Sequence, residues 1–167
     1  MIIMVMGLPG SGKSFFATKL AALLDAKYIS SDQIRMEKIS DRTYSDREKE
    51  WVYDEMLNEM VQIPHMQNHV VLDATFYSQR LRNKFLQNVN NNQILASIEI
   101  WAREAIVKSR LSHRRELSEA GIEIYQLIKS QWEPIREKHL TLESTQGNLH
   151  IMLQKAIQYL HTLKNDQ

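Results

Sequence analysis

The chain has 167 residues and carries 21 Lys and Arg against 20 Asp and Glu, a formal net charge of +1. This length predicts a single domain over residues 1–167 with its own core, and the near-neutral charge gives the whole chain no bias toward nucleic acid. The absence of cysteine excludes disulfides and thiolate metal sites. The apolar start is too short for a signal peptide or a membrane span, so we expect a cytoplasmic protein.

A fully apolar run over residues 2–6 predicts a buried parallel strand. Residues 14–24 predict a helix whose buried face holds Phe16, Leu20, Leu23 and Leu24. The segment between them therefore joins a strand to a helix.

That segment, residues 7–14 (GLPGSGKS), is a full match to the phosphate-binding pattern G-x-x-x-x-G-K-[ST]. Its glycines let the backbone approach a polyphosphate, and the exposed N–H groups and the helix N-terminus attract the anion. Lys13 is expected to reach the β- and γ-phosphates, and the Ser14 hydroxyl to ligate Mg²⁺. The residues predicted to bind the nucleotide are Gly7, Leu8, Pro9, Gly10, Ser11, Gly12, Lys13, Ser14 and Phe15.

A second strand is predicted over residues 27–31, and Asp32 follows at its carboxyl end, the edge where open α/β sheets bind ligands. Arg35 lies three residues later, on the same face of a helical first turn. A carboxylate and a guanidinium here suggest a base for an incoming hydroxyl and a clamp on an anionic acceptor. The alternative is that Asp32 only caps the helix and Arg35 is solvated.

Residues 37–50 are rich in charge and lack an apolar period, which indicates a mobile connection, part of an acceptor lid. Arg42 and Tyr44 are possible substrate contacts there, although a solvated loop is the stronger expectation. A helix is predicted from Asp46 to about residue 63, with Trp51 and Tyr53 in the core.

Residues 69–73 form the third strand signal, an apolar run closed by Asp73. An aspartate at such a strand end holds Mg²⁺ in phosphate-loop proteins, usually through water, and the alternative is a simple turn aspartate. Ser78 is expected to cap a helix through about residue 89. Arg80 and Arg82 on that helix face either the site or solvent.

A fourth strand is predicted over residues 94–101, where Glu99 between two isoleucines indicates one less buried side. Residues 103–115 then hold five Lys and Arg against one acid. Arg110 and Arg114 are four apart, hence helical neighbours suited to neutralise a transferring phosphoryl group, unless this is only a solvated helix face.

A helix over residues 118–132, a strand over 139–143 and a closing helix over 149–163 complete the pattern. The alternation of strands and helices predicts an α/β fold, a parallel sheet with helices on both faces.

The chain resembles the small phosphate-loop kinases of the polynucleotide-kinase, zeta-toxin and gluconate-kinase type, which are AAA-family ATP-binding proteins. The resemblance covers nearly the whole chain. It rests on residues 7–14, 31–35 (SDQIR), 71–75 (VLDAT) and 110–114 (RLSHR), and on 118–120 (SEA) with 132–134 (WEP). It implies the three-layer, adenylate-kinase-like P-loop sandwich, with five parallel strands in the order 2-3-1-4-5 and a helical lid over about residues 103–120.

The resemblance also implies roles. Asp32 matches the general base that deprotonates the acceptor hydroxyl, Arg35 matches an arginine that contacts an acceptor phosphate in 5′-polynucleotide kinases, and Arg110 and Arg114 match lid arginines around the ATP phosphates. The Asp-x-x-Arg pair also occurs in nucleotide kinases of the adenylate type, whose glycine-arginine lid signature is absent here. The gluconate-kinase motif after the second strand is absent too.

We therefore expect an ATP- and Mg²⁺-dependent phosphotransferase acting on a hydroxyl, first of all the 5′-hydroxyl of a polynucleotide or nucleotide-like acceptor. A small-molecule kinase for a sugar, metabolite or antibiotic is the alternative. A third hypothesis is a nucleotide-dependent binding or regulatory module with little turnover. The sequence indicates neither a membrane nor an obligate protein partner.

Overall fold

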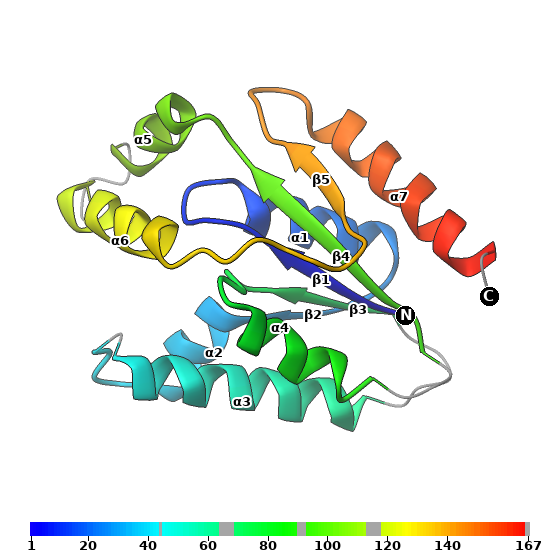
Figure 1. Ribbon diagram of the computed structural model, residues 1–167, viewed down its shortest axis with the longest axis horizontal. Coiled ribbons are helices and arrows are strands. Elements are labelled where there is room, and N and C mark those ends of the chain that lie inside the picture. Colours follow the sequence, from blue (N-terminus) through cyan, green and yellow to red (C-terminus); the bar gives the residue numbers. More distant parts are fainter. Residues whose placement is uncertain (44, 64–68, 90–92, 113–117, 166–167) are drawn as a thin grey trace.

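The structure is a computed structural model that describes residues 1–43, 45–63, 69–89, 93–112 and 118–165. Its centre is a five-stranded sheet whose neighbouring strands all pair in parallel, in the order β2-β3-β1-β4-β5 (Figure 1). This confirms the fold class and the strand order predicted above. The strands are β1 (Ile2–Met6), β2 (Lys27–Ser30), β3 (Val70–Asp73), β4 (Leu95–Trp101) and β5 (Leu140–Glu143).

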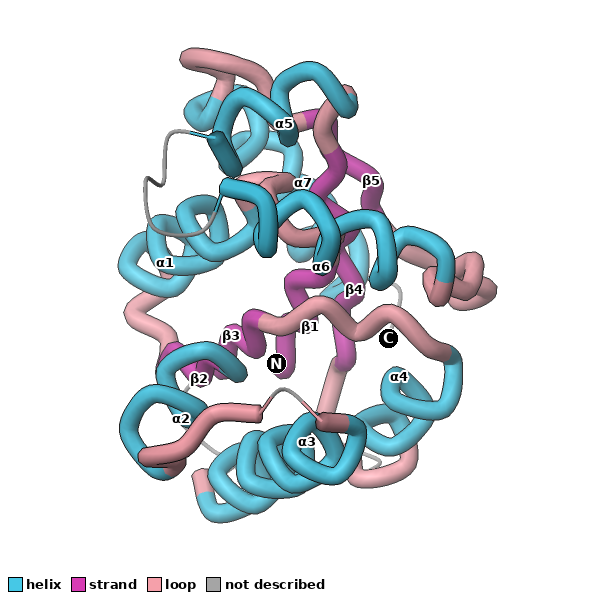
Figure 2. Tube along the Cα trace, turned by 90° about the vertical axis from the view of Figure 1, so that its left-hand side faces the viewer, coloured by secondary structure: helices cyan, strands magenta, loops and turns pink. Residues whose placement is uncertain are grey.

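Helices cover both faces of the sheet and complete the three layers. Among the described residues they are α1 (Lys13–Leu23), α2 (Ser31–Lys38), α3 (Asp46–Gln62), α4 (Gln79–Leu86), α5 (Glu104–Ser112), α6 (Ser118–Ser130) and α7 (Leu149–Asn165). α1 and α7 lie on one face of the sheet, and α3 and α4 lie on the other (Figures 1 and 2). α5 and α6 stand together beyond the carboxyl end of β4 (Figure 2).

The apolar run of β1 is explained by these two layers. Successive side chains of a strand point to opposite faces. Ile3 and Val5 belong to the core beside α1 and α7, whereas Met4 and Met6 belong to the core beside α3 and α4. A central strand that is buried on both faces has no polar side, so β1 shows no alternation.

The sheet register brings the carboxyl ends of β1, β2 and β3 together. Asp73 pairs with Val5 on one side and with Ser30 on the other. The phosphate-binding segment, the start of α2 and the end of β3 therefore meet at one edge, which is where an open parallel sheet binds ligands.

Two helix residues do not lie where the sequence placed them. The buried stripe of α1 runs through Phe16, Ala17, Leu20 and Ala21 and continues at Leu24, so Leu23 is 59% exposed. In α3 the stripe runs through Val52, Tyr53, Met56 and Met60, and Trp51, which precedes it, is 39% exposed. In both helices the buried stripe contains pairs of adjacent residues. The centre of the stripe is therefore rotated about the helix axis away from the face that the sequence predicted.

The charged stretch at 37–50 is mostly helical rather than a long connection. α2 continues to Lys38, and α3 begins at Asp46 after Ser45, whose side chain accepts a hydrogen bond from the Glu48 N–H. Only residues 39–45 connect the two helices. Arg42 is exposed, and Tyr44 lies outside the described residues.

The cap at Ser78 is confirmed, since its hydroxyl accepts a hydrogen bond from the Leu81 N–H, but α4 ends at Leu86, earlier than predicted. No described helix is both long and apolar enough to cross a membrane.

Candidate active site

The phosphate-binding segment forms a tight loop between β1 and α1, as its pattern predicts. Gly10 and Gly12 have φ values of +77° and +93°, in the left-handed region that favours glycine. A Cβ on Gly12 would lie 2.8 Å from Ser144 Oγ, and one on Gly10 would lie 2.9 Å from a Val107 methyl group. A side chain at either position would be strained by the positive φ and would have to displace a neighbouring side chain.

Lys13 and Ser14 are the first residues of α1, and both are half-buried. The Ser14 carbonyl accepts a hydrogen bond from Thr18 Oγ1 at 2.8 Å, within the helix, and Ser14 itself lies in the first turn of α1, beside the loop. The Phe15 side chain is 61% exposed, with the Lys19 ammonium 5.9 Å from its ring centroid. Phe15 therefore offers the site its backbone rather than its ring.

Asp73, at the end of β3, is buried and only half satisfied. It is 2% exposed, and its Oδ2 accepts a hydrogen bond from the Tyr28 hydroxyl at 2.6 Å. Its Oδ1 has no hydrogen-bond partner among the described residues. An orphaned buried carboxylate oxygen is costly, and it is the kind of ligand that Mg²⁺ takes in nucleotide sites, where one or two carboxylates act with the phosphates. The donor set at this edge of the sheet fits that ion.

Tyr28 was not singled out in the sequence, yet it contacts the key carboxylate. Burial raises the pKa of Tyr28 to about 12, and the charge of Asp73 and their hydrogen bond add to the shift. The hydroxyls of Thr18 and Ser30 act in the opposite direction, which places them around the same phenol group. Tyr28 therefore stays protonated as a donor and leaves Oδ1 of Asp73 free.

Asp32 and Arg35 form the predicted pair in α2. Arg35 Nη1 donates to Asp32 Oδ1 at 3.1 Å, and the Asp32 side chain is 69% exposed. The guanidinium is itself buried, because Arg35 Nε donates to Glu48 Oε1 at 2.9 Å. Glu48 Oε2 in turn accepts from the N–H and the hydroxyl of Thr43, at 2.6 and 2.9 Å. Asp32 is thus held in place by a network that ties α2 to α3.

Arg110 of α5 lies against the outside of the phosphate-binding loop. Its Nη1 donates to the carbonyls of Gly10 and Ser11, at 3.2 and 2.8 Å, and its Nη2 donates to Ser144 Oγ at 3.0 Å. Burial lowers the pKa of the guanidinium. The structure therefore places Arg110 against the loop, where it bonds to carbonyl groups, and its predicted contact with the ATP phosphates stays a prediction. Arg114 lies outside the described residues.

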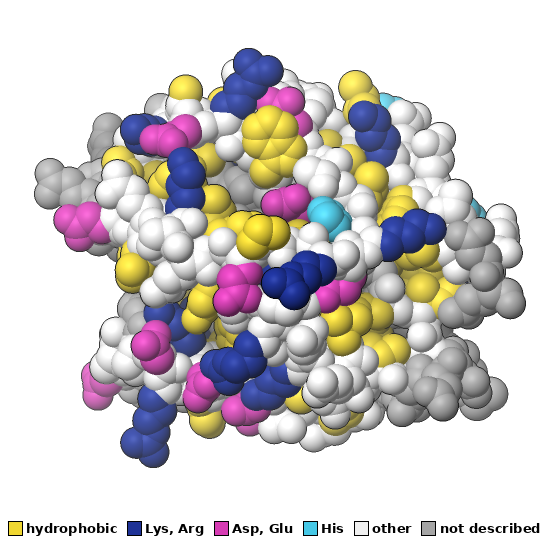
Figure 3. Space-filling model, viewed as in Figure 1, with side chains coloured by type: hydrophobic (Ala, Val, Ile, Leu, Met, Phe, Trp, Pro, Cys, Tyr) yellow, Lys and Arg dark blue, Asp and Glu magenta, His cyan; other side chains and the backbone are white. Residues whose placement is uncertain are grey.

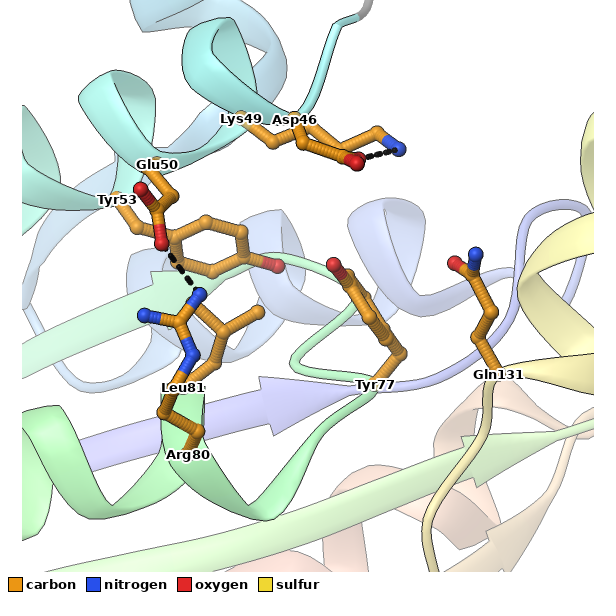
Figure 4. Close-up of a pocket in the computed structure, with 8 residues that line it drawn as sticks. All are labelled: Asp46, Lys49, Glu50, Tyr53, Tyr77, Arg80, Leu81 and Gln131. Atoms are coloured by element: carbon orange, nitrogen blue, oxygen red, sulfur yellow. Dashed lines mark hydrogen bonds and ion pairs between the residues drawn. The ribbon is translucent and has the colours of Figure 1, made fainter.

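A polar cavity of about 240 Å³ opens between α3, α4 and the end of α6 (Figure 4). Its charged side chains are paired: Lys49 with Asp46 at 3.1 Å, and Arg80 with Glu50. The other side chains that line it are Tyr53, Tyr77, Leu81 and Gln131.

Tyr53 connects this cavity to Asp32 and Arg35. Its hydroxyl accepts a hydrogen bond from the Phe76 N–H at 3.0 Å, and Figure 4 shows it pointing toward the Tyr77 hydroxyl. Burial raises the pKa of Tyr53, and the charges of Arg35 and Asp32 act on it as well. Tyr53, which lines the cavity, is therefore within electrostatic reach of the candidate base.

The sequence left open whether Arg80 and Arg82 face the site or solvent, and the two side chains differ in burial. Arg80 is exposed and lines the polar cavity, whereas Arg82 is 1% exposed. Arg82 donates to the carbonyls of Phe76, Glu133 and Pro134. It therefore anchors the segment after α6 to α4, which is a structural role.

The face seen in Figure 1 carries no continuous basic stripe among the described residues. Figure 3 shows Lys and Arg interspersed with Asp and Glu over that face. This matches the formal net charge of +1. A long polyanion has no extended track here.

A family model described as an AAA domain matches residues 2–135, well over half of the chain, so the chain belongs to this family. No curated protein matches its sequence.

The structure is similar to three solved kinases, each 18% identical in sequence. A gluconokinase from Sinorhizobium meliloti has a TM-score of 0.74, covering 98% of this chain and 93% of that one. The APS kinase CysC of Mycobacterium tuberculosis, in complex with AMPPNP and APS, has a TM-score of 0.76, with 96% of each chain covered. A shikimate kinase from Acinetobacter baumannii in complex with shikimate has a TM-score of 0.65, with coverage of 96% and 93%. At this identity the likeness establishes the P-loop kinase fold.

Proposed function

We propose that the protein transfers the γ-phosphoryl group of ATP to a hydroxyl group. The observation that carries the proposal is the buried, unpartnered Oδ1 of Asp73 at the sheet edge that also holds the phosphate-binding loop. The chain's membership of the AAA domain family and its similarity in fold to solved kinases support it.

The nucleotide phosphates would bind to the backbone N–H groups of residues 10–14 and to Lys13. Ser14 and Asp73 would hold Mg²⁺, Asp73 through water or directly, and the ion supplies charge neutralisation at the phosphates when bound. Arg110 holds the outside of the loop through the carbonyls of Gly10 and Ser11. The remaining positive charge at the lid would come from Arg114.

Asp32 would take the proton from the acceptor hydroxyl. Its carboxylate is exposed and fixed by Arg35, and it lies two residues after Ser30, which pairs with Asp73. As the proton passes to Asp32, the acceptor oxygen forms a bond to the γ-phosphorus, and the bond from that phosphorus to the β–γ bridging oxygen breaks. ADP leaves with the electron pair of that bond.

For the acceptor we favour a small polar molecule. The polar cavity beside Tyr53 holds two bases and two acids that neutralise each other, and a polyanion needs an excess of positive charge. The positive charge of Arg35 is also balanced, because its guanidinium forms ion pairs with Asp32 and Glu48. The 5′-hydroxyl of a polynucleotide is the second candidate, favoured by the Asp32–Arg35 pair at the spacing expected for such kinases.

The test is transfer of labelled γ-phosphate from ATP, with Mg²⁺, to 5′-hydroxyl oligonucleotides and to a panel of sugars and amino alcohols. Asp32→Asn should abolish transfer and leave ATP binding unchanged, because its carboxylate meets only the acceptor. Asp41→Asn, which removes an exposed acid from the α2–α3 connection, is the control. ATP binding without transfer to any acceptor would instead support a binding or regulatory module.

A further inference from the structure

A second cavity, of about 300 Å³, lies between the carboxyl end of β4, the phosphate-binding loop and the helices α5 and α6. This is within the range of small-molecule pockets. It shares no lining residue with the polar cavity, but the two linings are adjacent in sequence at the end of α6, where Gln131 of the polar cavity precedes Trp132 of this one. Its lining residues are Leu8, Ser11, Glu99, Ile100, Trp101, Ala102, Val107, Tyr125, Lys129 and Trp132.

The walls of this cavity are aromatic and its polar groups are few. Trp101, Tyr125 and Trp132 line it from three different segments, and Trp101 is 41% exposed although it ends a strand of the sheet. Ser11 is 1% exposed, and its Oγ has no hydrogen-bond partner among the described residues. In a packed protein core a buried hydroxyl normally has a hydrogen-bond partner. An unpartnered hydroxyl on the wall of a cavity therefore indicates a ligand whose polar group would be that partner.

Glu99 places a carboxylate on this cavity. It belongs to β4, whose other face is buried through Ile98 and Ile100, and this explains the alternation that stood out in the sequence. Among the residues that the structure describes, the carboxylate has only weak partners: Thr141 Oγ1 donates to it at 3.3 Å, and the His139 ring lies 3.8 Å away.

The nearby cations do not neutralise Glu99. Burial lowers the pKa of the Arg82 guanidinium, and the charges of Glu137, Glu133 and Glu99 oppose that shift, so Glu99 is one of three acids that share this cation. The Lys129 ammonium pairs with Glu104 at 2.8 Å and lies 5.6 Å from the Tyr125 ring centroid. The cavity therefore combines aromatic walls with an under-compensated negative charge.

We propose that this cavity binds an organic ammonium group, and that the phosphoryl acceptor is an amino alcohol or amino sugar. Aromatic faces with an adjacent carboxylate are the chemistry that recognises organic cations. Because Leu8 and Ser11 belong to the phosphate-binding loop, a hydroxyl carried by the same ligand lies on the phosphate side. The second part rests on the proposed function, and the first part does not.

Binding is measured first and needs no catalysis. Trp101 and Trp132 line the cavity, and Trp51 of α3 does not, so Trp51→Phe removes the background fluorescence. In this variant, tetramethylammonium chloride should change the fluorescence with saturation, whereas sodium chloride should not. Glu99→Gln should weaken binding at least about tenfold, as expected for loss of a charged partner.

Controls separate the cavity from general electrostatics and from folding. Glu123→Gln removes the same charge from an exposed position on α6 and should leave binding unchanged. If Glu99→Gln does not fold, Trp101→Leu replaces an exposed ring at the same cavity and should also weaken binding. Absence of saturation, equal binding by Glu99→Gln and the parent, or stronger binding of uncharged adenosine than of tetramethylammonium would overturn the proposal.

Acceptor assays with matched pairs then distinguish this inference from the proposed function. Glucosamine should be phosphorylated in preference to glucose, and 2-aminoethanol in preference to ethylene glycol, and Glu99→Gln should remove the preference. Transfer with no preference for the amine refutes the amino alcohol or amino sugar as acceptor and leaves the kinase proposal standing, while the ammonium site is decided by the tetramethylammonium titration. Saturable tetramethylammonium binding without transfer to any hydroxyl refutes the kinase proposal and leaves the site standing.

Discussion

The hydrogen bond from Tyr28 to Asp73 gives the sharpest test of the candidate site. Tyr28→Phe removes one hydroxyl and leaves the ring, so the half-buried phenol keeps its packing. Asp73 then loses its donor on Oδ2, and both of its oxygens lack a partner among the described residues. Such a change costs about 1.5–3 kcal/mol where the acceptor is charged, and we expect the lower part of that range because Tyr28 is only half-buried.

The same substitution should weaken Mg²⁺ binding, because Asp73 is no longer held with Oδ1 free. Loss of a residue that orients a metal ligand typically lowers metal affinity about 10- to 100-fold. The measurement is calorimetric titration with ADP in the presence and absence of Mg²⁺. We expect unchanged affinity for ADP alone and at least about a tenfold loss of the enhancement that Mg²⁺ provides.

Tyr159→Phe is the matched control. The Tyr159 hydroxyl donates to the Lys138 carbonyl at 3.4 Å, far along the chain from the phosphate-binding loop. It should change neither the ADP titrations nor the free energy of unfolding by more than a few tenths of a kcal/mol. If Tyr28→Phe lowers stability and yet keeps the full Mg²⁺ enhancement, Asp73 is not a metal ligand and the reasoning fails.

Three further changes follow from the structure. Gly12→Ala should lower ATP affinity at least about tenfold in calorimetry, because φ is +93° and the new Cβ would lie 2.8 Å from Ser144 Oγ; wild-type affinity would show that the loop adapts. Arg82→Leu should destabilise the fold by about 3–5 kcal/mol in urea unfolding, since it removes three charge-assisted hydrogen bonds, one of them to the buried Phe76 carbonyl; a loss below about 1 kcal/mol would contradict this anchoring role. Stability should fall as the pH rises from about 10 to about 12, because the folded state keeps the Tyr28 proton, with a pKa of about 12, after the unfolded chain has lost it. Urea midpoints at several alkaline pH values check this, and Tyr28→Phe should flatten the decline.

The sequence alone predicts the frame of this fold because its signals are local. A strand that is buried on both faces must be apolar throughout, and residues 2–6 are. A glycine-rich loop with Lys13 and Ser14 can be read without knowing any distant contact. The Asp32–Arg35 pair is also local, since three residues of helix bring the two side chains together.

Contacts between distant segments could not be predicted in this way. The partner of Asp73 is Tyr28, 45 residues earlier, and the second partner of Arg35 is Glu48, which looked like one more acid in a charged stretch. Trp51 and Leu23 were assigned to the core because their helices are amphipathic. The apolar periodicity of a helix predicts that it has a buried stripe. Which residues at the edges of that stripe are covered depends on the sheet face against which the helix packs.

Arg35 and Arg110 show how this difference changes a mechanism. Both were expected to contact ligands, and in the structure both bond to protein groups, Arg35 to two carboxylates and Arg110 to two loop carbonyls and Ser144. A guanidinium carries five donors in a fixed plane, so it can join several acceptors at once, and a lysine ammonium cannot reproduce that geometry. Arg110 contacts the loop through the carbonyls of Gly10 and Ser11, and the Ser11 N–H donates to the Leu8 carbonyl at 3.1 Å. Each arginine therefore fixes a group that we propose to meet the substrate: Arg35 holds Asp32, and Arg110 holds the phosphate-binding loop.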